Sequence, residues 1–195
     1  MACDVTLTGI SYGCDDLGVG GIVALAIANR ADVITAVGAA NIDNSTRIID
    51  NVAVTALAAG DIMGVQFNLK DGFSVFSEVK TVNADGTTST VPTISVEMPK
   101  MTVERVTALN QLSKAGAELV AFVQTAAGTY HVSGLDYGLY ASTVDGNSGT
   151  SRAEKNRFQL TLTGEENGLS YQFEETTVGD AGKPSWDAIT VNAVL

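Results

Sequence analysis

Alternation of apolar and polar residues dominates the middle of the chain and predicts long β-strands. Val65, Phe67 and Leu69 alternate with polar neighbours, and "FSVFSEVKTV" then leads to a turn at "NADG" before "TVPTISVEM". A period of two interrupted by Gly, Asn and Asp is typical of antiparallel strands joined by turns. The pattern predicts a hairpin over residues 73–98, which is longer than a compact sandwich of this size needs.

One segment departs from this period and predicts a helix over residues 102–115. Thr102 can act as its N-cap, and Gly116 follows where a C-terminal cap belongs. Apolar residues recur at three-residue steps, which indicates one face of a short helix. The residues expected to pack on the sheet are Val103, Val106, Leu109 and Leu112.

Most of the remaining chain also reads as strands. "GGIVALAIANRADVITAVG" predicts two strands joined by a turn at residues 29–32, and five further strand-like runs follow the helix. Residues 117–140 predict two paired strands, with Gly134 and Gly138 allowing bends or close backbone approach. With no internal repeat, we expect one domain over residues 1–195. Its fold class is mainly β and mostly antiparallel, with one α-helix and a long β-hairpin arm.

Composition and charge narrow the classes of function. The chain has 195 residues and a formal net charge of −11, with 11 Lys plus Arg against 22 Asp plus Glu. Because binding to phosphate depends on clustered Lys and Arg, such a surface repels nucleic acid. "MACDVTLTG" has no basic flank or long apolar core, and "GGIVALAIAN" is too short to span a bilayer. We therefore expect a soluble chain made in a cytoplasm, without a membrane partner.

Candidate chemistry is sparse. Cys3 and Cys14 suit two buried thiols best, with a disulfide or a zinc site as the alternatives. His131 is expected to be a hydrogen-bonded structural histidine at a strand surface, since no nucleophile and base are paired in the sequence. The adjacent carboxylates Glu165 and Glu166 are expected to be solvated loop charges, as are the two other acidic pairs. We predict no catalytic residue, no metal ligand and no cofactor, and no enzyme activity.

Two blocks of the chain carry a family resemblance. "MACDVTLTGISYGCDDLGVGGI" opens the chain, and "AFVQTAAGTYHVSGLDYGLYASTVDGNSGTSRAEKNRFQLTLTGEE" covers residues 121–166. Together they resemble a group of tailed-bacteriophage structural proteins with a Met-Ala-Cys-Asp type opening, which look like tail tube proteins. Residues 124–127 depart from the acidic-Asn-Gly turn that is common there, so this hairpin is expected to be looser.

The resemblance implies a virion structural protein of the phage tail, made in the host cytoplasm. It also implies that the fold is an antiparallel β-sandwich or split barrel with one flanking α-helix. Such subunits assemble into stacked hexameric rings around a channel through which DNA passes without specific binding. The implied partners are copies of this chain and other phage tail proteins. The hairpin would then be the assembly element, through Phe73, Val75, Glu78, Lys80, Val82, Asp85, Val91, Ile94 and Val96. The acidic residues that could line the channel are Asp71, Glu78, Asp85 and Glu97.

Two alternatives remain open from the sequence. One is another phage component, such as a head decoration, neck or tail-terminator protein. The other is a monomeric β-sandwich that binds carbohydrate, with Tyr130, Tyr137, Tyr140 and Trp186 as stacking platforms. Size in solution separates the two classes, because a ring protein forms large assemblies and a binding module does not.

Overall fold

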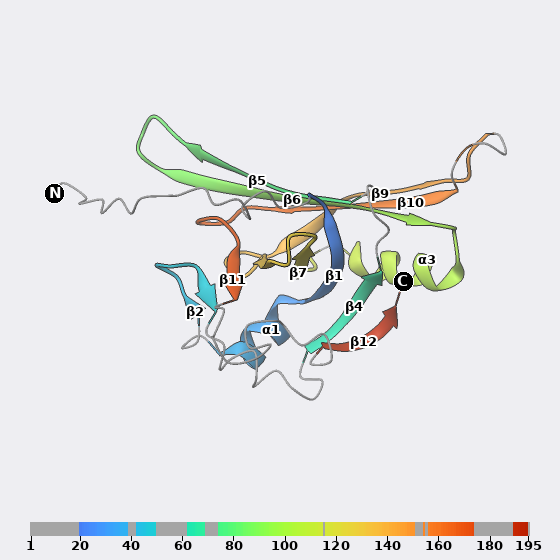
Figure 1. The fold of residues 1–195 in the computed structure, drawn as a ribbon, viewed down its shortest axis with the longest axis horizontal. Helices are drawn as coiled ribbons and strands as arrows, with labels where there is room; N and C mark the ends of the chain where they lie inside the picture. Colours follow the sequence, from blue (N-terminus) through green and yellow to red (C-terminus); the bar gives the residue numbers. More distant parts are fainter. Residues whose placement is uncertain are drawn as a thin grey trace.

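The computed structural model describes residues 20–38, 42–49, 62–68, 74–114, 116–150, 154, 156–173 and 189–194. Within them the chain is mainly β, with two helices and a mixed sheet that is not closed (Figure 1). The helices are α1 (Arg30–Val37) and α3 (Val103–Leu112). The strands are β1 (Ile22–Asn29), β2 (Ile42–Asp43), β3 (Ile48–Ile49), β4 (Ile62–Asn68), β5 (Val75–Val82), β6 (Thr88–Pro99), β7 (Leu119–Thr125), β8 (Tyr130–Ser133), β9 (Leu139–Asn147), β10 (Arg157–Gly164), β11 (Tyr171–Phe173) and β12 (Ile189–Val194).

Four strands, in the order β9-β10-β6-β5, form one long antiparallel layer, at the top of Figure 1. β5 and β6 pair from Val75 opposite Ser95 to Val82 opposite Thr88. The turn between them is closed by hydrogen bonds from Asn83 N–H to the Thr87 carbonyl and from Gly86 N–H to the Asn83 carbonyl. The hairpin predicted from alternation is confirmed. β10 pairs antiparallel with both β6 and β9, which makes a second long hairpin.

The other strands form a second layer below the first. β1 pairs with β4 and β7, β7 with β8, and β8 with β11, all antiparallel. The two layers join where Leu119 of β7 lies opposite Leu139 of β9. The predicted mainly β fold is confirmed, and most strand pairs are antiparallel. The sheet is nevertheless mixed, because β12 pairs with β4 and β11 with β3 in parallel. Both parallel pairs join segments far apart in the chain, as parallel pairing requires.

A large apolar core lies between the layers. Alternate residues of β6 and β10, such as Ile94, Val96 and Leu160, face the second layer and are buried. Leu25 and Ile27 of β1 meet them from below. Ala26 and Ala28, which alternate with them, face a second core on the far side of their layer. β1 is therefore apolar at nearly every position, because both of its faces are covered.

The second half of the first apolar segment forms a helix, not the strand predicted after a turn at residues 29–32. β1 ends at Asn29 and α1 begins at Arg30, whose backbone N–H donates to the Glu118 carbonyl at 3.0 Å. Val33 and Val37, four residues apart, lie on one face of α1 and are buried in the second core. Burial of these two valines in the second core stabilises the helix. The apolar–polar pattern of this segment, blurred by alanine, does not indicate that core.

The predicted helix α3 is present, but only two of the four residues predicted to pack on the sheet do so. Thr102 caps it, with its hydroxyl oxygen accepting from Arg105 N–H at 3.5 Å. Leu109 and Leu112 are buried as predicted, together with Ala108, whereas Val103 is 78% exposed and Val106 42% exposed. At about 3.6 residues per turn, nine residues make two and a half turns, so Val103 and Leu112 lie on opposite sides of the helix. Residues spaced three apart therefore stay on the buried side of the helix for about one turn, here Leu109 and Leu112.

Gly134 and Gly138 allow the close approaches expected of them. Both have a positive φ, of 95° and 88°. A Cβ at Gly134 would lie 2.4 Å from the Leu119 carbonyl oxygen, and one at Gly138 would lie 2.9 Å from the Glu118 Cβ. Glycine at these two positions brings the start of β9 against β7. The predicted pairing of the two strands in residues 117–140 is confirmed as β7 with β8.

Candidate functional site

The long four-stranded layer has two projecting arms, one at each end. At one end, residues 80–88 of the β5–β6 hairpin are exposed on both faces of the ribbon. At the other end, residues 142–148 of β9 are exposed (Figure 1). Neither arm is needed to cover the core of one chain. Strands that extend beyond their own core are available for a partner.

Both edges of this layer are free in the part of the chain that the structure describes. β5 pairs there only with β6, and β9 pairs with β7 only at its first residue, Leu139. β6 runs parallel to β9 because both are antiparallel to β10, so β5 runs opposite to β9. The two free edges therefore have the directions that antiparallel pairing between two copies requires.

The uncovered face of the layer is rich in hydroxyl groups and valine. Opposed residues share a face, and this face carries Val79 and Val91 on the β5–β6 hairpin and Thr93 and Thr163 on β6 and β10. Its described charges are few: Asp145, and Glu97 with Arg157, whose Nη1 lies 2.6 Å from Glu97 Oε2. The face remains open in this chain because the core lies on the other side.

The structure divides the predicted assembly residues into two groups. Val75, Lys80, Val82, Asp85 and Val91 are exposed. Ile94 and Val96 are fully buried in the large core, so the prediction that they contact a partner is wrong. They hold the root of the hairpin on the body. Phe73 lies outside the described residues.

Two of the four acidic residues expected in a channel are engaged inside the chain. Glu78 points from β5 toward the body, and Glu97 is paired with Arg157 with its side chain 13% exposed. Glu78 is thus turned away from the uncovered face of the layer, whereas Glu97 lies on that face with its charge paired. Asp85 is exposed at the hairpin turn, where its carboxylate accepts from the Thr87 N–H and hydroxyl. Asp71 lies outside the described residues.

Glu78 fastens the hairpin to the body through Ser170. The Ser170 backbone N–H and hydroxyl donate to the Glu78 carboxylate at 2.7 and 3.0 Å. Ser170 Oγ also lies 3.0 Å from His131 Nδ1, and His131 Nε2 lies 3.1 Å from Thr129 Oγ1. A serine hydroxyl has one hydrogen, so when it donates to Glu78 the imidazole must donate through Nδ1. Burial raises the pKa of Glu78 and lowers that of His131.

His131 thus has the hydrogen-bonded structural place expected of it. Its ring also lies 5.5 Å from the ring of Phe76 on β5. Ser170 is buried between the imidazole and the carboxylate, so its hydroxyl is shielded from solvent. The three side chains join β8, the residue before β11 and the hairpin.

A second contact fastens the other strand of the hairpin. Thr90 of β6 and Glu166 exchange two backbone hydrogen bonds, at 3.0 and 2.8 Å. The Glu166 side chain is fully buried, and its Oε2 accepts from the Asp136 backbone N–H at 3.2 Å. Its Oε1 and the Thr90 hydroxyl are buried and have no hydrogen-bond partner. The expectation that Glu166 is a solvated loop charge is wrong.

Arg47 organises the charges around Glu166. Its guanidinium lies 2.6 Å from Asp136 Oδ2 and 3.4 Å from Glu166 Oε2, and it donates to the carbonyls of Gly168 and Leu169. The same group lies 3.7 Å above the Tyr171 ring. One cation therefore binds two carboxylates, a loop backbone and an aromatic face.

The pKa values in this cluster diverge. Burial, followed by the nearby charge of Asp136, raises the pKa of Glu166 to about 7. Burial also acts on Asp136, but hydrogen bonds from Arg47, Tyr171 and Asn167 outweigh it and hold its pKa below the usual range. Burial and the bond to Asp136 raise the pKa of Tyr171. Near neutral pH the cluster thus has one firm carboxylate and one carboxyl group that can take up a proton.

Sequence reasoning missed this cluster. Arg47 lies in a polar turn, Asp136 in a loop and Tyr171 in a short strand. No motif or spacing links them, since only the fold brings the three segments together.

The three tyrosines and one tryptophan predicted as stacking platforms for carbohydrate do not form one site. Tyr137 and Tyr140 line one hollow of about 420 Å³ with the 113–118 loop. Tyr130 is half-buried against the second core, and Trp186 lies outside the described residues. The fold therefore brings two of the four rings together.

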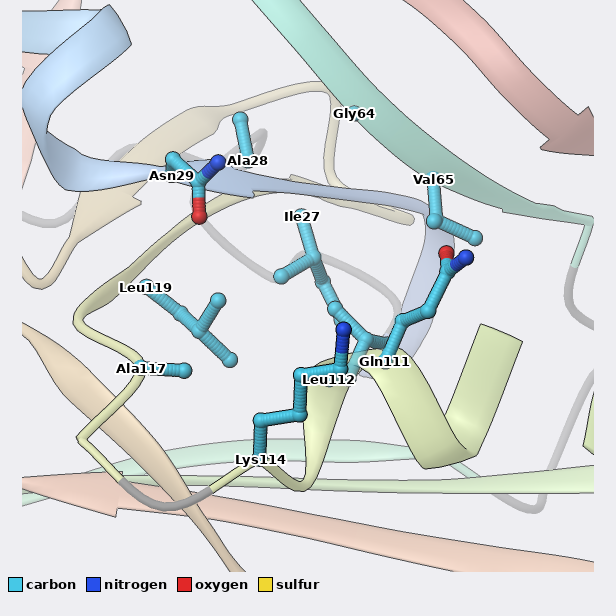
Figure 2. Close-up of a pocket in the computed structure, with 10 residues that line it drawn as sticks. All are labelled: Ile27, Ala28, Asn29, Gly64, Val65, Gln111, Leu112, Lys114, Ala117 and Leu119. Atoms are coloured by element: carbon cyan, nitrogen blue, oxygen red, sulfur yellow. The ribbon is translucent and has the colours of Figure 1, made fainter. Parts of the chain in front are cut away.

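A smaller hollow, of about 260 Å³, lies beside the same loop, and its lining residues are drawn in Figure 2. Its floor is made of buried core side chains such as Ile27, Leu112 and Leu119, and Asn29, Gln111 and Lys114 form its polar rim. Lys114 and Ala117 line both hollows.

Among the described residues, no group of three or more His, Cys, Asp or Glu side chains is placed to hold a metal ion. Neither described helix has the length and apolar character needed to cross a bilayer. Cys3 and Cys14 lie outside the described residues.

No protein-family model, curated protein or solved structure matches this chain.

Proposed function

We propose that this protein is a ring-forming structural subunit, a tail tube protein of a tailed bacteriophage. One observation carries the proposal: a four-stranded antiparallel layer ends in two free edges, β5 and β9, that run in opposite directions. When β5 of one copy pairs with β9 of the next, the alternation of strand directions continues across the contact. Such a head-to-tail contact closes into a ring when the rotation per copy fits.

The shape of the chain supports a channel inside this ring. The second layer and α3 cover one face of the four-stranded layer (Figure 1). In a closed sheet of several copies, these bodies fit outside and the uncovered face lines the opening. The projecting arms then lie where neighbouring copies meet.

The uncovered face suits the passage of DNA. Its described side chains are mainly Val, Ser and Thr, and its one described arginine, Arg157, is paired with Glu97. Binding of DNA phosphates depends on clustered Lys and Arg. The channel wall proposed here is nearly neutral and hydroxyl-rich, so DNA can slide along it without adhering. This replaces the acidic wall expected from the hairpin sequence.

Shortening the hairpin tests the assembly. Lys80 and Thr90 are opposite each other, so removing residues 81–89 and joining these two through Asn-Gly leaves the Thr90–Glu166 contact in place. We expect the wild-type chain to form rings or tubes in electron micrographs and the shortened chain to remain monomeric with an unchanged thermal transition. A wild-type chain that stays monomeric at high concentration contradicts the proposed function. Rings formed by the shortened chain contradict only the role of this arm.

Added charge tests the channel wall. Replacing Thr93 and Thr161 on the uncovered face by lysine places cations in the proposed channel, whereas Val103→Lys places one on the exposed side of α3. We expect DNA threading or retention, measured at low salt, to change only for the first variant. A structure of the assembly with a wall rich in Lys and Arg, or with no central opening, refutes the conduit.

A further inference from the structure

A groove beside the long layer contains the chain's most exposed described aromatic rings. Tyr137 is 60% exposed and Tyr140 57% exposed, and they are the only aromatic residues among the exposed large hydrophobic side chains of the described ranges. Both line the hollow of about 420 Å³, within the roughly 300–1,000 Å³ typical of small-molecule sites. Its other lining residues include Ser113, Lys114, Glu118 and Gly138.

The groove is held in shape by contacts of its lining residues. The Tyr137 hydroxyl donates to Asn167 Oδ1 at 3.1 Å, which orients that ring. Arg30 Nη1 holds Glu118 Oε2 at 3.0 Å, although the Glu118 side chain is 61% exposed. Gly138 has no Cβ, and one placed there would press on Glu118. A site that is already ordered loses little freedom on binding.

The chemistry of the lining favours an uncharged ligand with many hydroxyl groups. The tyrosine rings provide apolar faces and polar tips, and Ser113, Lys114 and Glu118 provide donors and acceptors. Lys114 and Glu118 have opposite charges, so the lining favours neither a phosphate nor a cation. A sugar ring presents an apolar C–H face for stacking and hydroxyl groups for both kinds of polar partner.

We propose that the groove formed by the 113–118 loop, Tyr137 and Tyr140 is a saccharide-binding site. Tyr140 belongs to β9, the edge that pairs with β5 of the next copy in the proposed ring, so the groove is a site of the unassembled chain. The proposal does not depend on the proposed tube function.

Titration with defined sugars tests the site. The full-length chain is titrated with neutral monosaccharides and their disaccharides, and with inorganic phosphate, while amide chemical shifts are followed. We expect saccharides, but not phosphate, to shift the signals of the 113–118 loop and of residues 137–141. Tyr140→Ala should weaken binding about tenfold, the factor that corresponds to losing about 1.4 kcal/mol of stacking. Tyr140→Phe keeps the ring and should retain most of the affinity.

Leu169→Ala, at another exposed position, is the matched control and should bind as the wild type does. The proposal is overturned if no sugar of the panel shifts these signals, if phosphate alone does so, or if Tyr140→Ala binds normally. Shifts that appear only as the chain self-associates would instead assign the groove to a second copy. Ring formation in micrographs of the same sample is scored separately, so failure of either proposal leaves the other standing.

Discussion

Ser170 donates two hydrogen bonds to the carboxylate of Glu78, from its backbone N–H at 2.7 Å and from its hydroxyl at 3.0 Å. This contact joins the edge strand of the long layer to the residue that precedes the short strand β11 of the body. It gives the hairpin a fixed direction where it leaves the core. An arm with a fixed direction can meet a neighbouring copy with less loss of conformational entropy.

Removing the Glu78 carboxylate should loosen the hairpin. Glu78→Ala leaves the buried Ser170 N–H without a partner, which costs about 1–3 kcal/mol in the free energy of unfolding. Lys80→Ala, at an exposed position of the same strand, should change it by less than about 0.5 kcal/mol. Urea denaturation measures both. Equal free energies of unfolding for the two variants would show that the Ser170 contact does not stabilise the fold.

Arg47 should be the most sensitive polar position. Arg47→Ala leaves Asp136 and Glu166 without their cation, and breaking a buried pair in this way costs about 3–5 kcal/mol. Arg47→Lys should recover part of the loss, since one ammonium cannot reach two carboxylates and two carbonyls together. The half-buried Arg105, whose guanidinium donates to the Lys100 carbonyl, provides the control Arg105→Ala. A small loss for Arg47→Ala in thermal unfolding would contradict its central place.

Stability should fall as the pH rises toward neutrality. The pKa of Glu166 is 4.5 when unperturbed and about 7 in the folded chain, so the folded state holds an extra proton between these values. The group's contribution is fully present below pH 4.5 and is lost as the pH rises through 7, by at most about 3 kcal/mol.

Glu166→Gln should flatten this dependence, because an amide does not titrate. Unfolding free energies measured between pH 4.5 and 8 for the wild type and this variant provide the comparison. A wild-type profile as flat as that of Glu166→Gln would mean that Glu166 titrates normally.

The two sides of α3 should respond differently to charge. Leu109→Asp forces a carboxylate into the large core and should cost several kcal/mol, of the order of about 3–5. Val103→Asp lies on the exposed side, at the N-terminus of the helix, and should be nearly neutral. Circular dichroism melting curves distinguish them. A normal transition for Leu109→Asp would refute the packing described for α3.

Gly134 and Gly128 form a matched pair for backbone strain. Both have a positive φ, but a Cβ at Gly134 would lie 2.4 Å from a carbonyl oxygen, and one at Gly128 has open space. Gly128→Ala should therefore cost about 1 kcal/mol, from the left-handed backbone alone. Gly134→Ala should cost clearly more, above about 2 kcal/mol, because the junction of β7 and β9 must shift. Differential scanning calorimetry gives both values, and equal losses would show that the close approach is relaxed.

The local sequence pattern was enough to predict elements that bury one face against a single core and expose the other. Alternation through the β5–β6 hairpin predicted its strands and its turn, and Thr102 predicted the start of α3. The two glycines before β9 were recognised because their role depends on backbone geometry. In these cases each residue's preference agrees with its final environment.

Tertiary structure decided everything that depends on a second surface or on distant segments. α1 exists because Val33 and Val37 find a second core, and Val103 is exposed because the body covers only one side of α3. Arg47, Asp136 and Glu166 are far apart in the chain and meet only in the fold. The sequence alone does not distinguish a buried carboxyl group from a solvated one. The sequence determined most of the strands and the long β5–β6 arm. The fold determined which charges are buried, since burial is a property of the neighbours that a residue acquires.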